Sequence, residues 1–414
     1  MPLRVLIIGL VWPEPTSSAA GSRMMQLIGF FLEKGYKVTF ACSANDSPYA
    51  SDLLMLGVDK VSIELNNSTF DDFVGELQPD IVMYDRYMIE EQFGWRVREV
   101  CPKAVQILDT EDLHCLRKTR EQSHKKGNSF DNRQLMQSEV AKREIASILR
   151  CDLSIMISAY EIDLLTTQFK IDPSLLIHIP FMIDAMDQKE TDGWTKFEER
   201  AHFVSIGNFR HPPNKDAVLY LKKEIWPLIR QQLPKTELHV YGAYVTSDME
   251  ALDAPNEGFL VKGRADDALQ VIGASRVLLA PLRFGAGLKG KLLEAMQVGT
   301  PSITTSIGAE SMSGDYPWPG SIANSVEEIV SSAIELYSEK SIWIERQAVG
   351  VQIVNQLYSK ELLNNKLSKK LSEIKSHLEE HRSNNFIGSM LQHHSLASTK
   401  YMSKWIEEKN KRAT

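Results

Sequence analysis

Short runs of apolar residues alternate with stretches of helical periodicity, and this alternation constrains the fold more than any other feature of the sequence. Residues 3–9 (LRVLIIG) are almost wholly apolar, as expected for a strand buried on both faces of a parallel sheet. A helical pattern over residues 23–34 follows and ends at Gly35, and residues 37–42 (KVTFAC) predict a second strand. Further strands are predicted at residues 81–84, 104–108 and 153–158. Strands that alternate with helices form a parallel sheet with right-handed crossovers.

The same pattern starts again after a polar stretch at residues 187–200, which indicates a domain boundary. The second set of strands is predicted at residues 202–207, 237–242, 259–262, 277–281 and 302–305. A chain of 414 residues is too long for one ordinary core and suits two. We therefore predict an α/β protein with two Rossmann-like domains, residues 1–186 and 187–375, and a helical tail, residues 376–414, that packs back on the first domain.

Composition argues against several classes of protein. The net charge of −7 disfavours nucleic acid as the main partner, because phosphate binding needs a positive surface. The four cysteines stand far apart without histidines at metal-ligand spacing, so we expect reduced thiols and no metal site. The apolar run at the N-terminus is too short for a signal peptide, and no run approaches the roughly 18 apolar residues of a spanning helix. These features predict a cytoplasmic protein.

The C-terminal tail is polar and helical, and it carries Tyr401, Met402 and Trp405 on one face. The simpler interpretation is a helix that docks this aromatic face on a domain. The alternative is a helix that binds a partner or a membrane.

The segment of residues 277–310, VLLAPLRFGAGLKGKLLEAMQVGTPSITTSIGAE, carries most of the chemical information. A buried strand is followed by a loop with Gly285 and Gly287, and then by a helix near residues 291–298. Glycines let backbone amides approach a ligand closely, and a helix N-terminus attracts anions. Lys289 and Lys291 add positive charge, so the segment suits a diphosphate. Glu294 lies one turn into the helix, where it could accept hydrogen bonds from ribose hydroxyls.

The same residues would also form a generic βα turn with solvated lysines, and the resemblance of this segment to a known family favours the donor site. It resembles the donor-site signature of the retaining GT-B glycosyltransferases of family 4, in which a glycine-rich loop leads into LEAM-x-x-G-x-P. In that family the second glutamate of an E-x7-E pair binds the ribose, and Glu294 matches it. The first glutamate is replaced by Ala286, as in a subgroup with glycines and basic residues there. The resemblance implies two Rossmann-like domains that face each other across a cleft.

A second match to the family lies at residues 207–216, GNFRHPPNKD, after the first strand of the second half. Members often carry an arginine and a lysine here that clamp the donor diphosphate. Asn208 takes the usual place of the arginine, so Gly207, Arg210 and Lys215 are the candidates. An exposed loop with incidental charge would explain the same residues.

The loop at residues 10–22, LVWPEPTSSAAGS, lacks the G-x-G-x-x-G of a dinucleotide-binding turn, and the second strand does not end in an acidic residue. An oxidoreductase is therefore disfavoured, and no cofactor is expected. In the family this loop faces the cleft and touches donor or acceptor, which makes Ser18 and Gly21 candidates.

Polar residues follow the strand at residues 104–108, in the sequence DTEDLH. Residues beyond the carboxyl end of a parallel strand face the ligand crevice. We take His114, with Asp109 or Asp112 to orient it, as the candidate for contact with the acceptor or the transferred sugar. A helix cap and a surface histidine would explain the same residues.

From His114 to Arg150, arginine and lysine outnumber acids nine to four. This basic stretch is either a helical face exposed to solvent or a surface for peripheral contact with an anionic membrane. By resemblance, the protein transfers a sugar from a nucleotide-diphosphate donor to a glycan or lipid-linked acceptor with retention, in the synthesis of polysaccharides. The alternatives are an epimerase or phosphorylase on the same fold, or a sugar-nucleotide-binding protein without activity.

Overall fold

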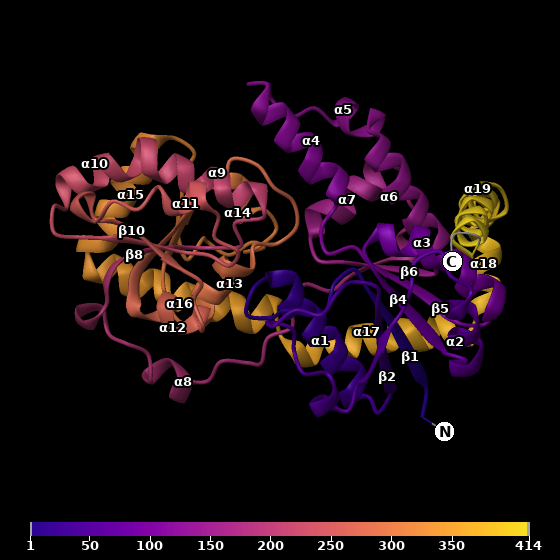
Figure 1. Ribbon diagram of the computed structural model, residues 1–414. Helices are drawn as coiled ribbons and strands as arrows, with labels where there is room; N and C mark the ends of the chain where they lie inside the picture. Colours follow the sequence, from indigo (N-terminus) through magenta and orange to yellow (C-terminus); the bar gives the residue numbers. More distant parts are fainter. Residues whose placement is uncertain (1, 412–414) are drawn as a thin grey trace.

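The computed structural model describes residues 2–411, with the side chains of residues 394–397 left aside. The last three residues of the predicted tail therefore lie outside the described residues. Two parallel sheets, each flanked by helices, form two α/β domains that lie side by side (Figure 1). The predicted fold class of two Rossmann-like domains with a helical C-terminal segment is confirmed.

The first domain contains a seven-stranded sheet in the order β3-β2-β1-β4-β5-β6-β7, with every adjacent pair of strands parallel. Its strands are β1 (Arg4–Gly9), β2 (Lys37–Cys42), β3 (Asp59–Ser62), β4 (Ile81–Asp85), β5 (Val105–Asp109), β6 (Leu153–Met156) and β7 (Leu176–His178). In the central strand β1, Val5 lies opposite Val38 on one side and Ile81 on the other. The strand order reverses between β1 and β4.

The second domain repeats this arrangement with a six-stranded parallel sheet in the order β10-β9-β8-β11-β12-β13. Its strands are β8 (Ala201–Ile206), β9 (Leu238–Tyr241), β10 (Phe259–Gly263), β11 (Ser275–Ala280), β12 (Ser302–Thr304) and β13 (Gly320–Ile322). Its strand order reverses between β8 and β11. Such reversal points open a crevice at the carboxyl ends of the strands, where ligands bind in open α/β sheets.

Helices cover both faces of each sheet (Figure 1). Those before the second sheet are α1 (Ala19–Glu33), α2 (Thr69–Leu77), α3 (Tyr87–Val100), α4 (His114–Lys125), α5 (Asn132–Gln137), α6 (Glu139–Arg150), α7 (Ala159–Thr167) and α8 (Gln188–Asp192). Those of the second domain are α9 (Pro212–Tyr220), α10 (Trp226–Gln232), α11 (Ser247–Glu250), α12 (Ala268–Ala274), α13 (Gly290–Gln297), α14 (Ser306–Ala309), α15 (Val326–Ser338) and α16 (Lys340–Leu357). The chain ends with α17 (Lys360–Ser376), α18 (Leu378–Asn384) and α19 (Phe386–Lys411). Short 3-10 or π turns lie at Leu54–Leu56, Pro173–Leu175, Phe197–Glu199, Leu221–Ile225 and Pro255–Glu257.

The chain returns to the first domain immediately after α16. Ile183 on the outgoing segment exchanges two backbone hydrogen bonds with the returning segment, at Tyr358 and Lys360. Leucines and an isoleucine of α17 are then buried in the core of the first sheet, at Leu363, Leu367, Leu371 and Ile374. Residues 360–375 therefore lie on the first domain, although the sequence placed them in the second. The apolar face of α17 completes one side of the first core, and burial of that face decides its place.

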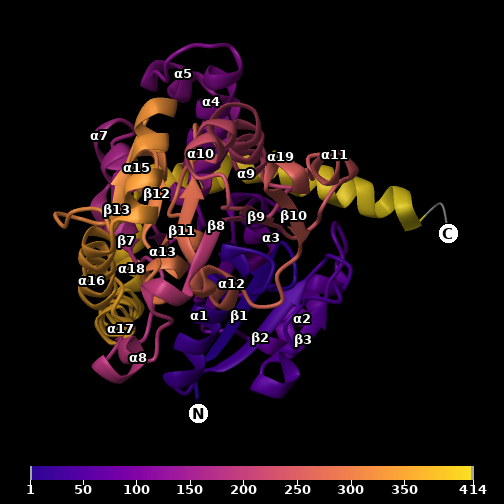
Figure 2. The ribbon, with the colours of Figure 1, turned by 90° about the vertical axis from the view of Figure 1, so that its left-hand side faces the viewer.

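Helix α19 packs on α3 and α6 of the first domain and extends beyond the rest of the molecule at its C-terminal end (Figure 2). The expected docking of the aromatic face is wrong, because the side chains of Tyr401 and Trp405 are 68% and 61% exposed. The opposite face docks instead. Arg96 of α3 is almost fully buried and binds Ser403 at 3.2 Å, with a carboxylate oxygen of Glu407 at 3.8 Å. A buried guanidinium needs such polar partners, so the face of α19 that carries Ser403 and Glu407 packs against α3.

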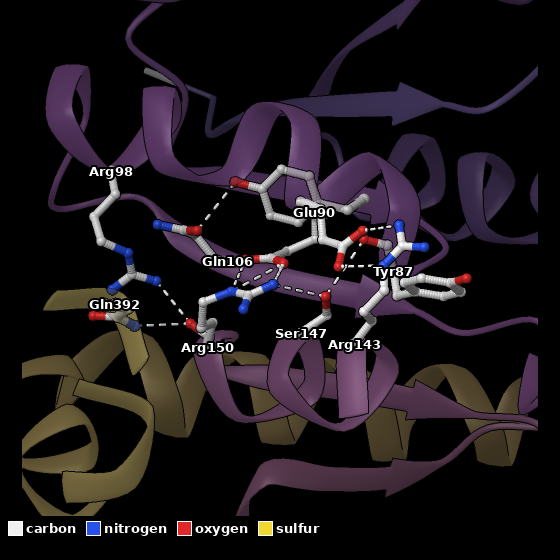
Figure 3. Close-up of polar contacts among 10 residues, drawn as sticks. Tyr87, Glu90, Arg98, Gln106, Arg143, Ser147, Arg150 and Gln392 are labelled. Carbon is white, nitrogen blue, oxygen red and sulfur yellow. Dashed lines mark hydrogen bonds and ion pairs between the residues drawn. The ribbon is translucent and has the colours of Figure 1, made fainter. Parts of the chain in front are cut away.

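A buried ion pair joins α3 to α6 beside the tail (Figure 3). The guanidinium of Arg150 binds both carboxylate oxygens of Glu90, with a distance of 2.9 Å from Nε to Oε1, and the two side chains are 4% and 2% exposed. The backbone carbonyl of Arg150 accepts hydrogen bonds from Arg98 at 2.7 Å and from Gln392 of α19 at 3.0 Å. This network ties the tail to the helix layer of the first domain.

The basic stretch from His114 to Arg150 is largely paired. Seven of its nine cations form ion pairs in the described structure, namely Arg117, Arg120, Lys125, Arg133, Lys142, Arg143 and Arg150. Several of their partners lie on other elements, so this stretch serves packing between helices and between domains.

Candidate functional site

A cavity of 440 Å³ lies between the two domains, where the carboxyl ends of the two sheets face each other. It is lined by the segments that follow β4 and β5 in the first domain and by those that follow β8, β10 and β11 in the second. We call it the donor cavity. Six Lys and Arg side chains and three carboxylates line it, although the whole chain is acidic. Its wall is therefore suited to an anionic ligand.

Two helix N-termini meet at this cavity, one from each domain. Helix α13 begins at Gly290, with no capping side chain from Lys289, and α1 begins after the N-cap Ser18. A Cβ atom on Gly290 would lie 2.7 Å from the Cβ of Ala19, so only glycine lets the two helix ends approach this closely. The amides and partial positive charges of both ends are directed toward the same space.

Lys289 and Lys291 line the cavity beside these helix ends. Burial lowers the pKa of each ammonium to about 8, against the opposing effect of nearby carboxylates. Lys291 Nζ donates to Asn214 Oδ1 at 2.8 Å, and Lys289 Nζ donates to the carbonyl of Gly287 at 2.6 Å. Two partly desolvated cations at helix N-termini form a site in which a dianion gains charge-assisted hydrogen bonds.

Glu294 also lines the donor cavity, one turn after the start of α13. Burial raises the pKa of its carboxyl, while Lys291 opposes this shift. The geometry therefore brings Lys289, Lys291 and Glu294 together, as the contiguous motif implied.

The glycine loop has a different role at each position. Gly285 lines the cavity, while Gly287 does not. Gly287 has a φ of 63°, and a Cβ there would lie 2.8 Å from the Cβ of Asp112 in the first domain. Its amide donates to Glu161 of α7 at 2.8 Å, away from the cavity. Gly287 thus allows close contact between the domains.

The candidates after β8 separate in the structure. Gly207 and Arg210 line the donor cavity, with the guanidinium of Arg210 stacked 3.8 Å from the ring centroid of Tyr244. Lys215 does not line the cavity and forms an ion pair with Asp248. Lys291 and Asn214 lie beside Gly207 instead, because a Cβ on that glycine would lie 2.7 Å from Lys291 Nζ and 2.7 Å from the Asn214 amide group.

On the side of the first domain, His114 and Asp112 line the cavity and Asp109 does not. His114 Nε2 lies 3.3 Å from Asp112 Oδ1, so Asp112 is the residue that orients the imidazole. Burial lowers the pKa of His114 to about 4, which keeps the ring neutral at neutral pH. Burial by itself would raise the pKa of Asp112. The Arg117 guanidinium, whose Nε lies 2.6 Å from Asp112 Oδ2, outweighs burial and holds this pKa below its usual range. Asp109 is instead buried against Arg23, at 3.1 Å.

Ser18 and Gly21 belong to the start of α1 rather than to a loop. Ser18 Oγ accepts the Gly21 amide at 3.1 Å and caps the helix. Ser18 lines the donor cavity, and Gly21 lines a neighbouring cavity. A Cβ on Gly21 would lie 2.3 Å from the carbonyl oxygen of Glu14, so this glycine lets the preceding loop fold back on the helix.

Sequence reasoning missed several residues of the cavity wall: Arg86, Glu111, Arg117, His211 and Arg264. Arg86 follows β4 directly and Arg264 follows β10. The rule that pointed to Asp109 and His114, that residues after parallel strands face the crevice, also applies to these two arginines.

A separate cluster of metal-ligand residues, His202, Glu237 and His239, lies at the opposite end of the second sheet, with ligand atoms within 4.8 Å of one another. The Glu237 amide donates to His202 Nδ1 at 3.2 Å, which leaves the proton of the neutral ring on Nε2. That nitrogen faces the cluster and is then a poor ligand. The cluster lies far from the donor cavity in the fold.

Comparison with known proteins agrees with this geometry. Residues 200–339 match the model of the family Glycosyl transferases group 1. The chain is a glycosyltransferase with the GT-B fold. The matched segment contains β8 to β13, all six strands of the second sheet, and the whole donor loop with α13. None of the curated proteins matched the sequence of the enzyme.

Solved structures resemble the glycosyltransferase over both domains at low sequence identity. Sucrose-phosphate synthase from Thermosynechococcus elongatus has a TM-score of 0.64 and 15% identity, covering 90% of this chain and 99% of that one. Anabaena Alr3699/HepE, solved in complex with UDP and glucose, has a TM-score of 0.64 and 11% identity, covering 89% and 99%. S. aureus TarM has a TM-score of 0.55 and 13% identity, and the match covers 72% of this chain and 57% of TarM. The likeness establishes the shared fold.

Proposed function

We propose that this glycosyltransferase moves a sugar from a nucleoside diphosphate donor to a glycan or lipid-linked acceptor, with retention of configuration at the anomeric carbon. The observation that carries the proposal is the meeting of two helix N-termini with Lys289 and Lys291 in one wall of the donor cavity. A diphosphate bound there would receive backbone amides and two ammonium groups. As the bond to the anomeric carbon breaks, negative charge grows on the leaving diphosphate, and these groups stabilise it.

The rest of the donor would occupy the same cavity. Glu294 is the residue we assign to the ribose hydroxyls, because its carboxylate lies one turn beyond the diphosphate site. Ala286 stands where the family has a glutamate that contacts the sugar. We assign that contact to His114 and Asp112 of the first domain, which line the cavity opposite the donor loop. The neutral imidazole can donate one hydrogen bond and accept another.

Solved relatives support a nucleotide donor. Alr3699/HepE was solved with UDP and glucose, and TarM was solved with UDP and α-GlcNAc-glycerol. Retention and the class of acceptor rest on the resemblance of residues 277–310 to the family. Proton NMR of the product tests retention, because the anomeric coupling constant must match that of the donor. An inverted product would refute it.

We propose in addition that the enzyme works in the cytoplasm at the inner face of a membrane, where a lipid-linked acceptor would lie. None of the described helices is both long and apolar enough to cross a bilayer. The exposed face of α19 supports peripheral contact, because Tyr401, Met402 and Trp405 are solvent-exposed and Lys409 lies 5.4 Å from the Trp405 ring centroid. Co-sedimentation with anionic liposomes should fall in Trp405→Ser. Equal binding of both proteins, or none by either, would refute this contact.

A thermal-shift screen tests the donor. UDP-, GDP-, ADP- and CDP-linked sugars are added to the wild type and to Lys291→Met, and Lys340→Met of α16 is the matched control on the surface. A ligand at about 100 times its Kd stabilises the folded state by about 2.7 kcal/mol, which moves Tm by several degrees. We expect one nucleotide class to shift the wild type and the control but not Lys291→Met. A panel without any shift, or with equal shifts in all three proteins, would overturn the proposed donor site.

A further inference from the structure

A second cavity, also of 440 Å³, adjoins the donor cavity on the side of the first domain. We call it the acceptor-side cavity. It lies at the carboxyl ends of β1, β2, β4 and β5, and Asn208, Arg210 and Tyr244 of the second domain complete its wall. Six residues line both cavities and mark their junction: Ser18, Ala20, Arg86, Glu111, Asn208 and Arg210. The two cavities are therefore adjacent, as the binding sites of an acceptor and of a transferred sugar must be.

The two cavities differ in charge. Six Lys and Arg side chains and three carboxylates line the donor cavity, whereas two arginines and four acids line the acceptor-side cavity. The arginines are Arg86 and Arg210, and the acids are Glu14, Asp46, Asp85 and Glu111. The wall therefore changes from a surplus of cations to a surplus of carboxyl groups across the junction. A pair of substrates that fits this change carries its negative charge on the donor side only.

The two arginines of the acceptor-side cavity already have partners. Arg86 Nε lies 3.6 Å from Asp85 Oδ1. Burial by itself would lower the pKa of Arg86, but Asp85 and Glu111 outweigh burial and raise it. Arg210 stacks on the ring of Tyr244 and also lines the donor cavity, whose ligand is an anion in the proposed function. Neither arginine is therefore left to balance a second anion.

Asp85 lines the acceptor-side cavity at the end of β4, and its two carboxylate oxygens have different surroundings. Oδ2 accepts the Leu10 amide at 3.0 Å. Oδ1 is buried and accepts no hydrogen bond in the described structure, since Arg86 Nε at 3.6 Å is beyond hydrogen-bond distance. A buried carboxylate oxygen without a donor is costly. A hydroxyl group of a ligand in this cavity would supply the missing donor.

Glu14, on the loop after β1, offers a second acceptor of hydrogen bonds in the same cavity. Its Oε2 accepts a hydrogen bond from the Tyr244 hydroxyl at 2.6 Å, which joins the two domains across the cavity. Its Oε1 accepts no side-chain or backbone hydrogen bond among the described residues. Because Tyr244 holds the carboxylate in place, the second oxygen is free to accept from a ligand.

The surroundings of Glu111 disfavour further negative charge at the junction. Burial raises the pKa of Glu111 well above its usual value, and Asp109 and Asp85 raise it further, while Arg86 and Arg23 oppose the shift. A carboxylate or a phosphate on the acceptor would meet the same burial and the same acids. Hydroxyl groups donate hydrogen bonds to carboxylates without adding charge.

We propose that the acceptor-side cavity binds a sugar residue without an anionic group, whose hydroxyls donate hydrogen bonds to Asp85 and Glu14. The inference rests on the proposed function and narrows its acceptor to glycans whose accepting residue is uncharged. An accepting residue that bears a carboxylate or a phosphate, such as a hexuronate or a sugar phosphate, does not fit. A lipid-linked acceptor then carries any phosphate outside this cavity.

The test uses the full chain and the nucleotide sugar that gives the largest thermal shift in the screen above. Methyl glycosides of glucose, galactose, mannose and N-acetylglucosamine serve as neutral acceptors, and the matching uronates and phosphate esters carry the anion. Mass spectrometry detects the product, and release of the nucleoside diphosphate gives the rate. We expect at least one neutral glycoside to be glycosylated, with a kcat/KM at least about tenfold above that of its anionic analogues.

The isosteric Asp85→Asn separates the proposed contact from a structural role. Its amide oxygen can still accept the Leu10 amide, whereas its amide nitrogen takes the place of Oδ1 and cannot accept a hydroxyl. We expect KM for the neutral glycoside to rise about tenfold or more, as loss of a charge-assisted hydrogen bond implies. The donor Kd measured by calorimetry should stay within about twofold. Glu14→Gln should raise the same KM, and Asp59→Asn on the exposed edge strand β3 is the matched control.

The outcomes separate this inference from the proposed function. A wild type that uses a uronate or a phosphate ester better than the neutral parent would overturn the inference, and so would an unchanged KM in both Asp85→Asn and Glu14→Gln. Consumption of the donor without glycosylation of any neutral glycoside would overturn it as well, while the donor site would stand. If the wild type consumes none of the nucleotide sugars, the proposed function fails and this inference fails with it.

Discussion

Lys289 and Lys291 give the donor site a dependence on pH that can be measured directly. Burial lowers the pKa of each to about 8 in the ligand-free enzyme. A bound diphosphate favours the charged form and raises both values. Affinity is therefore highest below about pH 8, where both lysines already carry their protons. It falls as the pH rises above 8, because each lysine must then take up a proton to bind.

The magnitude follows from the neutral fraction of each lysine. With a pKa of about 8, the affinity falls roughly eightfold per lysine between about pH 7.5 and about pH 9, and roughly seventyfold when both bind the diphosphate. At about pH 8.5, binding should take up about 0.75 proton per lysine. Lys291→Met should reduce the loss to roughly eightfold and the uptake to about 0.75 proton in total.

Isothermal titration calorimetry measures both quantities for the nucleoside diphosphate identified in the screen. Proton uptake appears as a difference in binding enthalpy between two buffers with different heats of ionisation. Titration of the nucleobase affects the wild type and the variant equally, so the difference between them isolates Lys291. Lys340→Met should behave as the wild type does. A binding enthalpy that does not depend on the buffer at pH 8.5, or equal uptake in Lys291→Met, would show that these lysines do not bind the diphosphate.

Three more predictions follow from the site and from the packing around it. Glu294→Ala should weaken nucleotide binding tenfold or more in calorimetry, as loss of a charge-assisted hydrogen bond of roughly 1.5–3 kcal/mol implies, and an unchanged Kd would exclude the ribose contact. Arg120→Met removes an ion pair with Glu310 that joins the two domains, so small-angle scattering should show a larger radius of gyration. An unchanged radius of gyration would show that this ion pair does not hold the domains together. Arg150→Met leaves the buried carboxylate of Glu90 unpaired, so urea unfolding should show that the free energy of unfolding falls by about 3–5 kcal/mol. A second change, Glu90→Gln, should restore part of this stability. Additive losses in the double variant would contradict this account.

The central strands of both sheets could be predicted from the sequence because each is buried on both faces. β1, β4, β5 and β11 are mostly apolar, and every residue of these strands except Arg4 and Arg276 is buried. The edge strands β3, β7 and β13 were missed. Their sequences, DKVS, LIH and GSI, are short or polar, and a half-exposed edge strand needs no apolar run. The start of α1 was placed at Arg23 rather than Ala19, because Gly21 in its first turn resembles a loop residue.

The residues that the two domains contribute to the site also differ in how far the sequence could predict them. Lys289, Lys291 and Glu294 lie on one contiguous segment, so their meeting follows from a single loop and helix, and the sequence contains all of it. Asp109 ends β5 and Glu111 follows it, and the sequence could not separate these two acids, because they differ in the partners that the fold brings to them. Asp109 is neutralised by Arg23, which is 86 residues away in the chain.

The donor loop itself depends on the first domain. The carbonyl of Gly285 accepts a hydrogen bond from Arg120 at 2.9 Å, and the amide of Gly287 donates to Glu161 at 2.8 Å. Both partners lie outside the donor cavity, on α4 and α7. If the domains separated, both bonds would break, and the loop that positions Lys289 would lose its support. Donor binding and domain closure are therefore coupled through the loop backbone, and each should strengthen the other by the same free energy. We therefore expect Arg120→Met to weaken nucleotide binding, although Arg120 lies outside the cavity and does not contact the nucleotide.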